Sequence, residues 1–257
     1  MSTTKATKPA KAPTKTPAHT AARKKTVKRD PEKTQARILD AATAEFAAKG
    51  YSGARTEQIA KRAKSNIRML YHYHGGKDAL YTRVLEDVLA RLREQELQLD
   101  FSSATPLDGI LRLFDFIDGH FSTHPELLQL LAFENLNKAA HLRKSTRIPQ
   151  QASPVLDLIN TLLQRGQAEG VFRTGIDALH LYVSMVSLAY YGKSHAHTLS
   201  RIFKQDLLAR DWQAAHRAQN HQMLAGFLGH HASSAHTTSV SALGQPKDTK
   251  PAKRSKP

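Results

Sequence analysis

One stretch, residues 56–80, constrains the fold of this chain more than any other part of its sequence. It reads TEQIAKRAKSNIRMLYHYHGGKDAL: a short helix-favouring segment, a polar turn at residues 64–66, a second short segment rich in aromatic and basic side chains, and a double glycine. Two short helices joined by a tight turn form a helix-turn-helix, whose second helix enters the major groove of DNA. The stretch therefore predicts a DNA-reading element.

Apolar side chains recur at helical spacing on both sides of this stretch, which predicts an all-α protein. Asp30 and Pro31 suit the start of a first helix, and Gly50 suits its end. Thr56 is expected to cap the second helix and Asn66 the third. The expected helices cover residues 31–49, 56–63, 67–73 and 77–97, and further helices include residues 106–123, 127–133, 155–163, 176–191 and 206–227.

The formal charge of +16 is unevenly distributed along the chain. Residues 1–29 hold nine basic side chains and no acid, whereas residues 81–230 hold fifteen of each sign. Within the expected folded part, the surplus of positive charge therefore lies on residues 30–80. We expect a disordered basic tail at 1–29, a helix-turn-helix DNA-binding domain at 30–80, a second helical domain at 81–230, and a disordered tail at 231–257. The first tail either attracts phosphate or only adds solubility.

Several spaced motifs in residues 31–80 occur together: FAAKGY at 46–51, Ile59-Ala60, LYHY at 70–73, and then Gly75, Lys77 and Ala79-Leu80. This set resembles the DNA-binding domain of the tetracycline-repressor (TetR) family. The chain departs from the family pattern at residues 64–66, where the family usually has Gly-Val-Ser, and at His74, where the family usually has Phe. Lys64 thus stands where a glycine would more easily adopt a left-handed backbone.

The resemblance implies roles for three matching positions. In the family, the residues equivalent to Thr56 and Tyr71 contact phosphates, and the lysine equivalent to Lys77 grips the DNA backbone. It also implies that residues 81–230 form a wholly helical effector-binding and dimerisation domain. In such a dimer the last two helices pair with those of a second subunit. The long helix predicted at 77–97 would link the two domains.

The chemistry of the reading helix adds further candidates. Arg68, near the start of this helix, can pair with a guanine edge, and His72 follows one turn later on the same face. Arg55 and Tyr73 suit phosphate contacts that set register, although an aromatic at position 73 also suits packing between helices. The expected DNA-binding residues are Arg55, Thr56, Asn66, Arg68, Tyr71, His72, Tyr73 and Lys77.

For the effector pocket, polar side chains mixed with aromatic ones in the second domain are the candidates. Each of them also suits an ordinary core position, because aromatic residues and Met at helical spacing are common in cores. The expected effector-binding residues are Phe114, His120, Phe133, Glu134, Asn135, Tyr182, Met185, Tyr190 and His195.

The sequence lacks the usual signatures of several other classes of protein. The chain has no cysteine, which excludes disulfides and thiolate metal sites, and we expect no cofactor and no metal site. Its fourteen histidines leave a metal-responsive regulator open as an alternative, and a helical enzyme is a second alternative, although we expect no enzymatic activity. Residues 176–191 are too short and too polar at one end for a membrane span.

We therefore expect a sequence-specific DNA-binding transcription regulator of the bacterial cytoplasm, associated with the nucleoid when bound to DNA. The expected partners are double-stranded operator DNA, a small-molecule effector and a second copy of the chain, with no membrane. A homodimeric repressor released from its operator by the effector is the main hypothesis, and an activator is compatible with the same residues.

Overall fold

A computed structural model of the chain describes residues 1–2 and 30–229, apart from the side chains of residues 151–153. The two tails expected at 1–29 and 231–257 lie outside the described residues, except for residues 1 and 2. Within the described ranges all regular structure is helical, and the only strand-like pairing is an isolated bridge between Phe172 and Gly229. The prediction of an all-α fold is confirmed.

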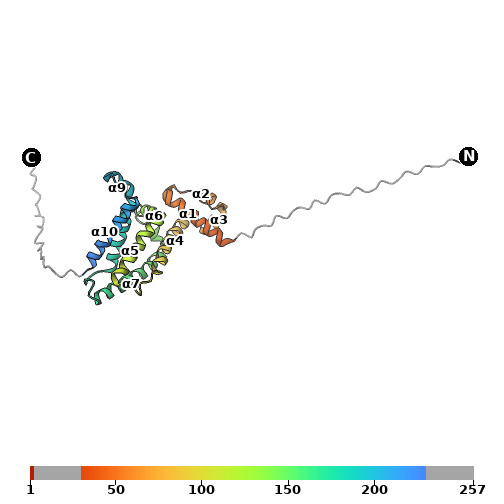
Figure 1. Cartoon of the computed structure of the whole chain (residues 1–257). Helices are drawn as coiled ribbons and strands as arrows, with labels where there is room; N and C mark the ends of the chain where they lie inside the picture. Colours follow the sequence, from red (N-terminus) through yellow and green to blue (C-terminus); the bar gives the residue numbers. More distant parts are fainter. Residues whose placement is uncertain (3–29, 230–257) are drawn as a thin grey trace, which may run out of the picture.

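The first four helices are α1 (Pro31–Gly53), α2 (Thr56–Arg62), α3 (Ile67–His74) and α4 (Lys77–Leu97). Figure 1 shows α1 to α3 gathered at one end of the molecule. Their shared core contains Ile38, Phe46, Ile59 and Leu70, each with no exposed surface. These four large apolar side chains come from all three helices, and their burial is what holds the short helices α2 and α3 in place.

The ends of α1 follow from local chemistry. Asp30 accepts hydrogen bonds from the backbone N–H groups of Glu32 and Lys33 at 3.1 and 3.4 Å, as a helix cap does. Gly50 has a φ of 65°, which kinks the helix, and the segment after it runs on to Gly53. The ring of Tyr51 then stacks on that of Phe46, with centroids 6.4 Å apart. The predicted cap is confirmed and Gly50 has the predicted left-handed φ, but α1 ends at Gly53 and not at residue 49.

The start of α2 differs from the prediction. Arg55, in an extended conformation, occupies the cap position and makes no side-chain capping hydrogen bond, while Thr56 is the first helical residue. Thr56 is only 7% exposed because it packs inside the DNA-reading end of the molecule. The prediction that Thr56 caps α2 is therefore wrong.

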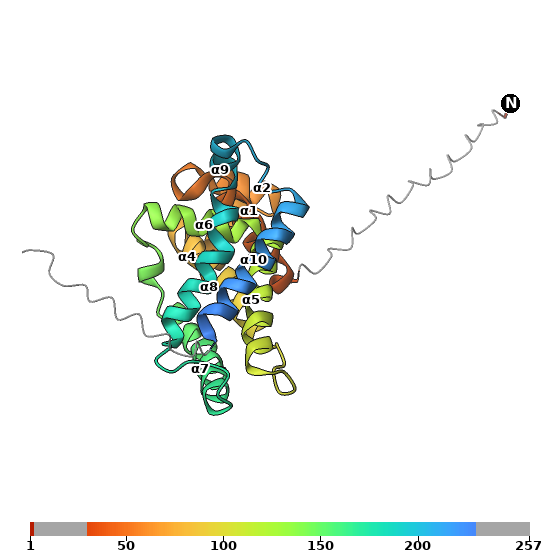
Figure 2. The ribbon, with the colours of Figure 1, turned by 60° about the vertical axis from the view of Figure 1, so that its left-hand side comes forward.

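The rest of the chain forms a larger helical domain around α5 (Pro106–Thr123), which packs against α4, α6, α7, α8 and α10. Its buried stripe contains Ile110, Leu113, Phe114 and Ile117. Figure 2 shows α5, α8 and α10 running side by side. The other elements are α6 (Pro125–Leu136), η1 (Leu142–Lys144), α7 (Arg147–Ala168), α8 (Ala178–Ser194), α9 (Ala196–Phe203) and α10 (Arg210–Leu228).

Two elements join the DNA-reading end to the larger domain. The helix α4 packs on α1 and α3 and, further along, on α7. The helix α6 packs on α1, where the ring of Phe133 lies so close to Gly50 that an added Cβ would be 2.9 Å from Phe133 Cδ1. Gly50 thus serves both the left-handed backbone and the close approach of α6. Within the described residues, no helix combines the length and apolar character that a membrane crossing requires.

Candidate functional site

The reading helix α3 is fixed at both ends by local hydrogen bonds. The backbone N–H of Arg68 donates to Asn66 Oδ1 over 2.9 Å, which confirms Asn66 as its cap. At the other end Gly75 adopts a left-handed φ of 74°, and its N–H donates to the carbonyl of Tyr71. Leu70 is fully buried and anchors the helix from below. These contacts hold the opposite face of α3 toward solvent.

The turn before α3 accommodates an unusual residue. Lys64 has a φ of 49°, in the left-handed region that glycine adopts most easily. The backbone N–H of Ser65 donates to the carbonyl of Ala60 over 3.0 Å and closes the turn. The lysine at residue 64, where the family usually has glycine, therefore adopts a left-handed conformation.

Most of the predicted DNA-binding side chains lie on the exposed face of this motif. Arg55, Arg68, Tyr71 and His72 are exposed, and Tyr71 retains 49% of its surface. Within residues 30–229 the guanidinium groups of Arg55 and Arg68 form no ion pair or hydrogen bond. Because Arg68 and His72 are one turn apart, they share a face of α3. The result is a surface of polar side chains with unused hydrogen-bonding capacity.

Three predicted residues are less available. Tyr73 is half-buried against the core and its ring lies 5.2 Å from that of His72. Lys77 is also half-buried; its ammonium donates to the carbonyl of Ser52 at 3.5 Å and lies over the ring of Tyr51. Thr56 is buried. Packing explains Tyr73 and Thr56 without DNA, and phosphate contacts by these three residues remain predictions.

His74, where the family usually has phenylalanine, takes a packing position. It is half-buried, and its Nε2 has no hydrogen-bond partner within the described residues. Burial, together with the nearby charge of Arg83, lowers the pKa of His74. A neutral imidazole in this place substitutes for an aromatic ring.

The predicted effector residues are spread over the larger domain. Phe114 and Met185 are fully buried core residues. Tyr190 packs edge-on against Phe121, and Phe133 lies against Gly50. Asn135 and His195 are exposed.

Two of the remaining candidates hold the structure together through buried polar contacts. Glu134, 1% exposed, accepts hydrogen bonds from the backbone N–H groups of His141 and Leu142 at 3.1 and 3.2 Å, and His141 Nδ1 lies 2.9 Å from its other oxygen. Tyr182 Oη is 2.6 Å from an Arg93 nitrogen and 3.5 Å from Glu96 Oε1. Burial and the carboxylate of Glu96 raise the pKa of Tyr182 to about 12. Both residues therefore have partners within the chain.

The last candidate, His120, is buried and stacks on His124 with ring centroids 4.1 Å apart. Burial, and secondarily the neighbouring His124, lowers the pKa of His120 to about 4. Its imidazole is therefore neutral at ordinary pH. Within the described ranges, no group of three or more His, Asp or Glu side chains is placed to hold a metal ion.

Two cavities in the described part of the larger domain have none of the nine predicted effector residues in their walls. The larger, of about 690 Å³, lies among α5, α6, α8 and α10. The smaller, of about 430 Å³, lies among α8, α9 and α10 and has Tyr191, Phe203 and Trp212 in its wall. The residues of the larger cavity were missed because they have no motif in the sequence.

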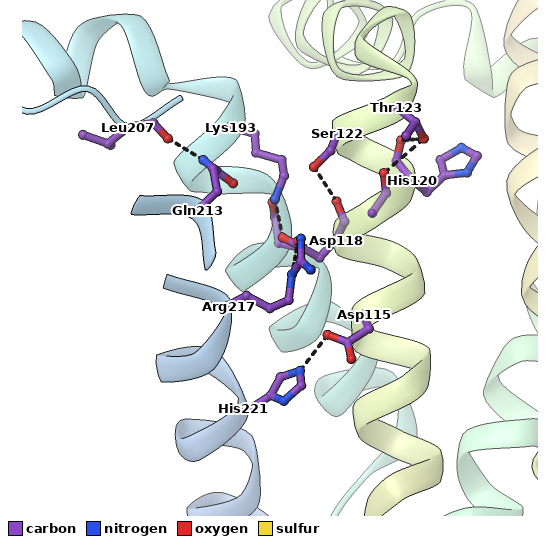
Figure 3. A network of polar contacts seen from close by, with 12 residues as sticks. Asp115, Asp118, His120, Ser122, Thr123, Lys193, Leu207, Gln213, Arg217 and His221 are labelled. Atoms are coloured by element: carbon purple, nitrogen blue, oxygen red, sulfur yellow. Dashed lines mark hydrogen bonds and ion pairs between the residues drawn. The ribbon is translucent and has the colours of Figure 1, made fainter. Parts of the chain in front are cut away.

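A buried carboxylate lies behind the larger cavity. Asp118 on α5, 2% exposed, pairs with Lys193 on α8 and with Arg217 on α10, whose Nε is 2.9 Å from Asp118 Oδ2. Figure 3 shows both cations converging on this carboxylate, with the pair Asp115 and His221 further along the same seam. Three helices are therefore joined at one ionic cluster.

Both the DNA-reading end and the larger domain match models of known protein families. Residues 38–84 match the family model described as bacterial regulatory proteins, tetR family, and residues 106–224 match that of the tetracyclin repressor-like C-terminal domain. The chain is 36% identical over 183 residues to the HTH-type transcriptional repressor NicS of Pseudomonas putida, covering 71% of this chain and 86% of NicS.

Further likenesses agree with this match. The HTH-type transcriptional repressor SCO4008 of Streptomyces coelicolor is 34% identical over 163 residues, which cover 63% of this chain and 79% of SCO4008. The crystal structure of SCO4942 from the same species superposes with a TM-score of 0.58 over 76% of this chain and 98% of that one, at 24% identity. This last likeness concerns the fold alone.

Proposed function

Because this chain belongs to the TetR family of DNA-binding transcription regulators, we propose that it is a homodimeric repressor that leaves its operator when a small-molecule effector binds. Residues 30–80 form the DNA-binding domain in this proposal, and residues 81–230 bind the effector and the second subunit. The observation that carries it is the capped helix α3, which presents Arg68 and His72 to solvent. Neither side chain has a hydrogen-bond or ion-pair partner within residues 30–229. The relatives that match most of the chain are named as repressors, which points to regulation and away from catalysis.

In the DNA complex we assign base reading to Arg68. Its guanidinium can donate two parallel hydrogen bonds to the O6 and N7 atoms of guanine, and such a contact discriminates by about 1 to 3 kcal/mol. His72, one turn further, lies beside it over the same groove. Arg55 and Tyr71 flank the helix and suit phosphates, so they set register and carry no sequence information.

The proposed dimer interface is an apolar face on α8 and α10. Leu179 and Val183 on α8 are each 52% exposed, and Met223 and Phe227 on α10 are 54% and 47% exposed. Both pairs are four residues apart, so each pair lies on one side of its helix. A second copy that covers this face would form a four-helix bundle. A two-fold dimer also suits operator half-sites about one turn of DNA apart.

Release from DNA requires that the larger domain influence α3. The continuous helix α4 and the contact of α6 with α1 at Gly50 both connect the larger domain to the DNA-reading end. An effector that binds one arrangement of these helices better than another would shift the population toward it. In the released state the two copies of α3 would no longer match the spacing of the operator half-sites.

Binding to the DNA that flanks the gene for this chain tests the proposal. Fluorescence anisotropy with this DNA should show a complex that forms at lower protein concentration than with a scrambled duplex, and light scattering should give two chains per site. Equal affinity for both duplexes would overturn the proposal. Val183→Glu, which places a charge in the apolar face, should yield monomers that bind the operator weakly. Lys204→Glu, at the exposed residue directly after α9, should remain dimeric.

A further inference from the structure

The larger cavity combines an apolar wall with a cluster of cations. Phe121, Leu128, Ala132 and Ala214 supply apolar surface from α5, α6 and α10. A cavity of about 690 Å³ falls within the range of small-molecule sites in proteins. It therefore has the size and the wall for an organic molecule with an apolar body.

The charged side chains of this cavity all have the same sign. Lys193, Arg210 and Arg217 line it, and no acidic residue is among the lining residues. Cations gathered in a partly apolar recess raise the local concentration of anions and favour their binding. The cavity thus discriminates by charge as well as by shape.

The carboxylate that pairs with two of these cations leaves part of their charge unmatched. Asp118 is buried behind the cavity and pairs with both Lys193 and Arg217, so one negative charge faces two positive ones. Arg210 forms no ion pair or side-chain hydrogen bond within residues 30–229. A second anion would therefore find Arg210 and the exposed part of Arg217 free to donate charge-assisted hydrogen bonds.

We propose that this cavity binds a small amphiphilic anion, an aromatic or branched aliphatic acid whose carboxylate or sulfonate lies between Arg210 and Arg217. The inference rests on the proposed function and names the site and the chemical class of its effector. It differs from the sequence expectation, because none of the nine predicted effector residues takes part. The apolar body of the acid packs against Phe121 and Leu128.

Such a ligand would act on the helices that carry the proposed dimer interface. Arg217 lies on α10, and its ion pair with Asp118 joins α10 to α5. An acid group that takes hydrogen bonds from Arg217 competes with Asp118 and weakens this connection. Because α10 also carries Met223 and Phe227, a small displacement of α10 changes how two subunits pack.

A matched pair of dyes tests the charge requirement on the full chain. The probe is 8-anilinonaphthalene-1-sulfonate, and N-phenyl-1-naphthylamine has the same rings without the sulfonate. In Arg210→Gln and Arg217→Gln we expect the anionic dye to bind about tenfold more weakly, and the neutral dye to bind as before, because each change removes one charged donor. Arg112→Gln, at an exposed arginine of α5 that does not line the cavity, should change neither affinity.

A steric variant tests the location independently of charge. Ala214→Trp places a large ring in the wall of the cavity and should lower the affinity for the anionic dye at least about tenfold, because the ring occupies the space of the ligand. Far-ultraviolet circular dichroism checks that each variant is folded. The inference is overturned if both arginine variants keep the affinity of the original chain, if both dyes lose affinity equally, or if the anionic dye does not bind.

Measurement of DNA binding on the same samples separates the two proposals. If the chain prefers its own flanking DNA while the arginine variants bind the anionic dye unchanged, only the inferred site is wrong. If the chain shows no preference among DNA sequences, the proposed function is wrong, whatever the dyes show.

Discussion

Polar side chains in the two domains of this protein differ in exposure and in the number of partners that they have. On the DNA-reading helix α3, Arg68, Tyr71 and His72 are exposed, and the Arg68 guanidinium has no partner among the described residues. In the larger domain, Asp118 and Glu134 are almost fully buried. Asp118 accepts a hydrogen bond from Arg217, which is distant in the sequence, and Glu134 accepts one from the backbone N–H of His141. The first set is available to an external partner, and the second holds helices in place.

This difference separates binding from stability. An exposed side chain without partners contributes little to folding, so its substitution should change affinity and leave the free energy of unfolding unchanged. A buried ionic group has the reverse effect, because loss of one partner leaves the other charged and desolvated. Substitutions in each set test whether the two sets behave in this way.

Substitution of Asp118 should have the largest effect on stability. Asp118→Asn leaves Lys193, which is nearly buried, without its counter-charge, and should lower the free energy of unfolding by about 3 to 5 kcal/mol. Urea unfolding at a fixed protein concentration measures this change. Asp115→Asn is the matched control on the same helix, because its pair with His221 is partly exposed and should contribute less than about 1 kcal/mol. Equal effects of the two changes would contradict the distinction.

Glu134 should come next. Glu134→Gln replaces a carboxylate that accepts two backbone hydrogen bonds and one from His141, and should lower the free energy of unfolding by about 2 kcal/mol. The control is Glu126→Gln on the same helix, where no hydrogen bond or ion pair is formed within the described residues. If urea unfolding shows both variants within about 0.5 kcal/mol of the original chain, Glu134 does not hold the loop after α6.

His120 should make stability depend on pH. Its pKa is lowered from 6.5 to about 4 in the folded protein, so the unfolded chain binds a proton more readily between these values. The free energy of unfolding should fall as the pH decreases from 6.5 to 4, by at most about 1.4 kcal/mol per pH unit from this group, and should be insensitive to it above 6.5. Thermal unfolding of His120→Phe over this range should show a shallower slope; an unchanged slope would count against a neutral buried His120.

The smallest effect concerns the turn before α3. Lys64→Gly relieves a left-handed backbone at a residue with a side chain, and the greater freedom of glycine in the unfolded chain offsets part of the gain. We expect the free energy of unfolding to rise by about 0.5 kcal/mol. Lys61→Gly, in the last turn of α2, should lower it by about 1 kcal/mol instead. A loss of stability in both variants would show that the turn holds Lys64 without strain.

Local signals allowed most of the DNA-reading end to be predicted from the sequence. Asn66 and Gly75 mark the ends of α3 through contacts with residues two to four positions away, and Leu70 marks its buried side. Thr56 was misplaced by one residue, because Arg55 takes the extended cap position without a side-chain hydrogen bond. Helix α9, at residues 196–203, was missed, since it is short and only Ala196 in it is buried.

The larger domain shows why its site had no such signal. Asp118 is 75 residues from Lys193 and 99 from Arg217 in the sequence, so no short-range motif could predict this ionic cluster. The predicted effector residues were chosen by type, and Glu134 and Tyr182 instead contact His141 and Arg93 within the chain. Packing between distant helices decides which polar side chain is a ligand contact and which is structural.

The most direct test of the account is the affinity of Arg68→Ala for the operator, measured by fluorescence anisotropy beside urea unfolding of the same sample. We predict a loss of about 1 to 3 kcal/mol in operator binding, little change in binding to a scrambled duplex, and an unchanged free energy of unfolding, with Arg112→Ala as the control. An Arg68→Ala variant that binds the operator as tightly as the original chain would contradict the assignment of base reading to the exposed face of α3.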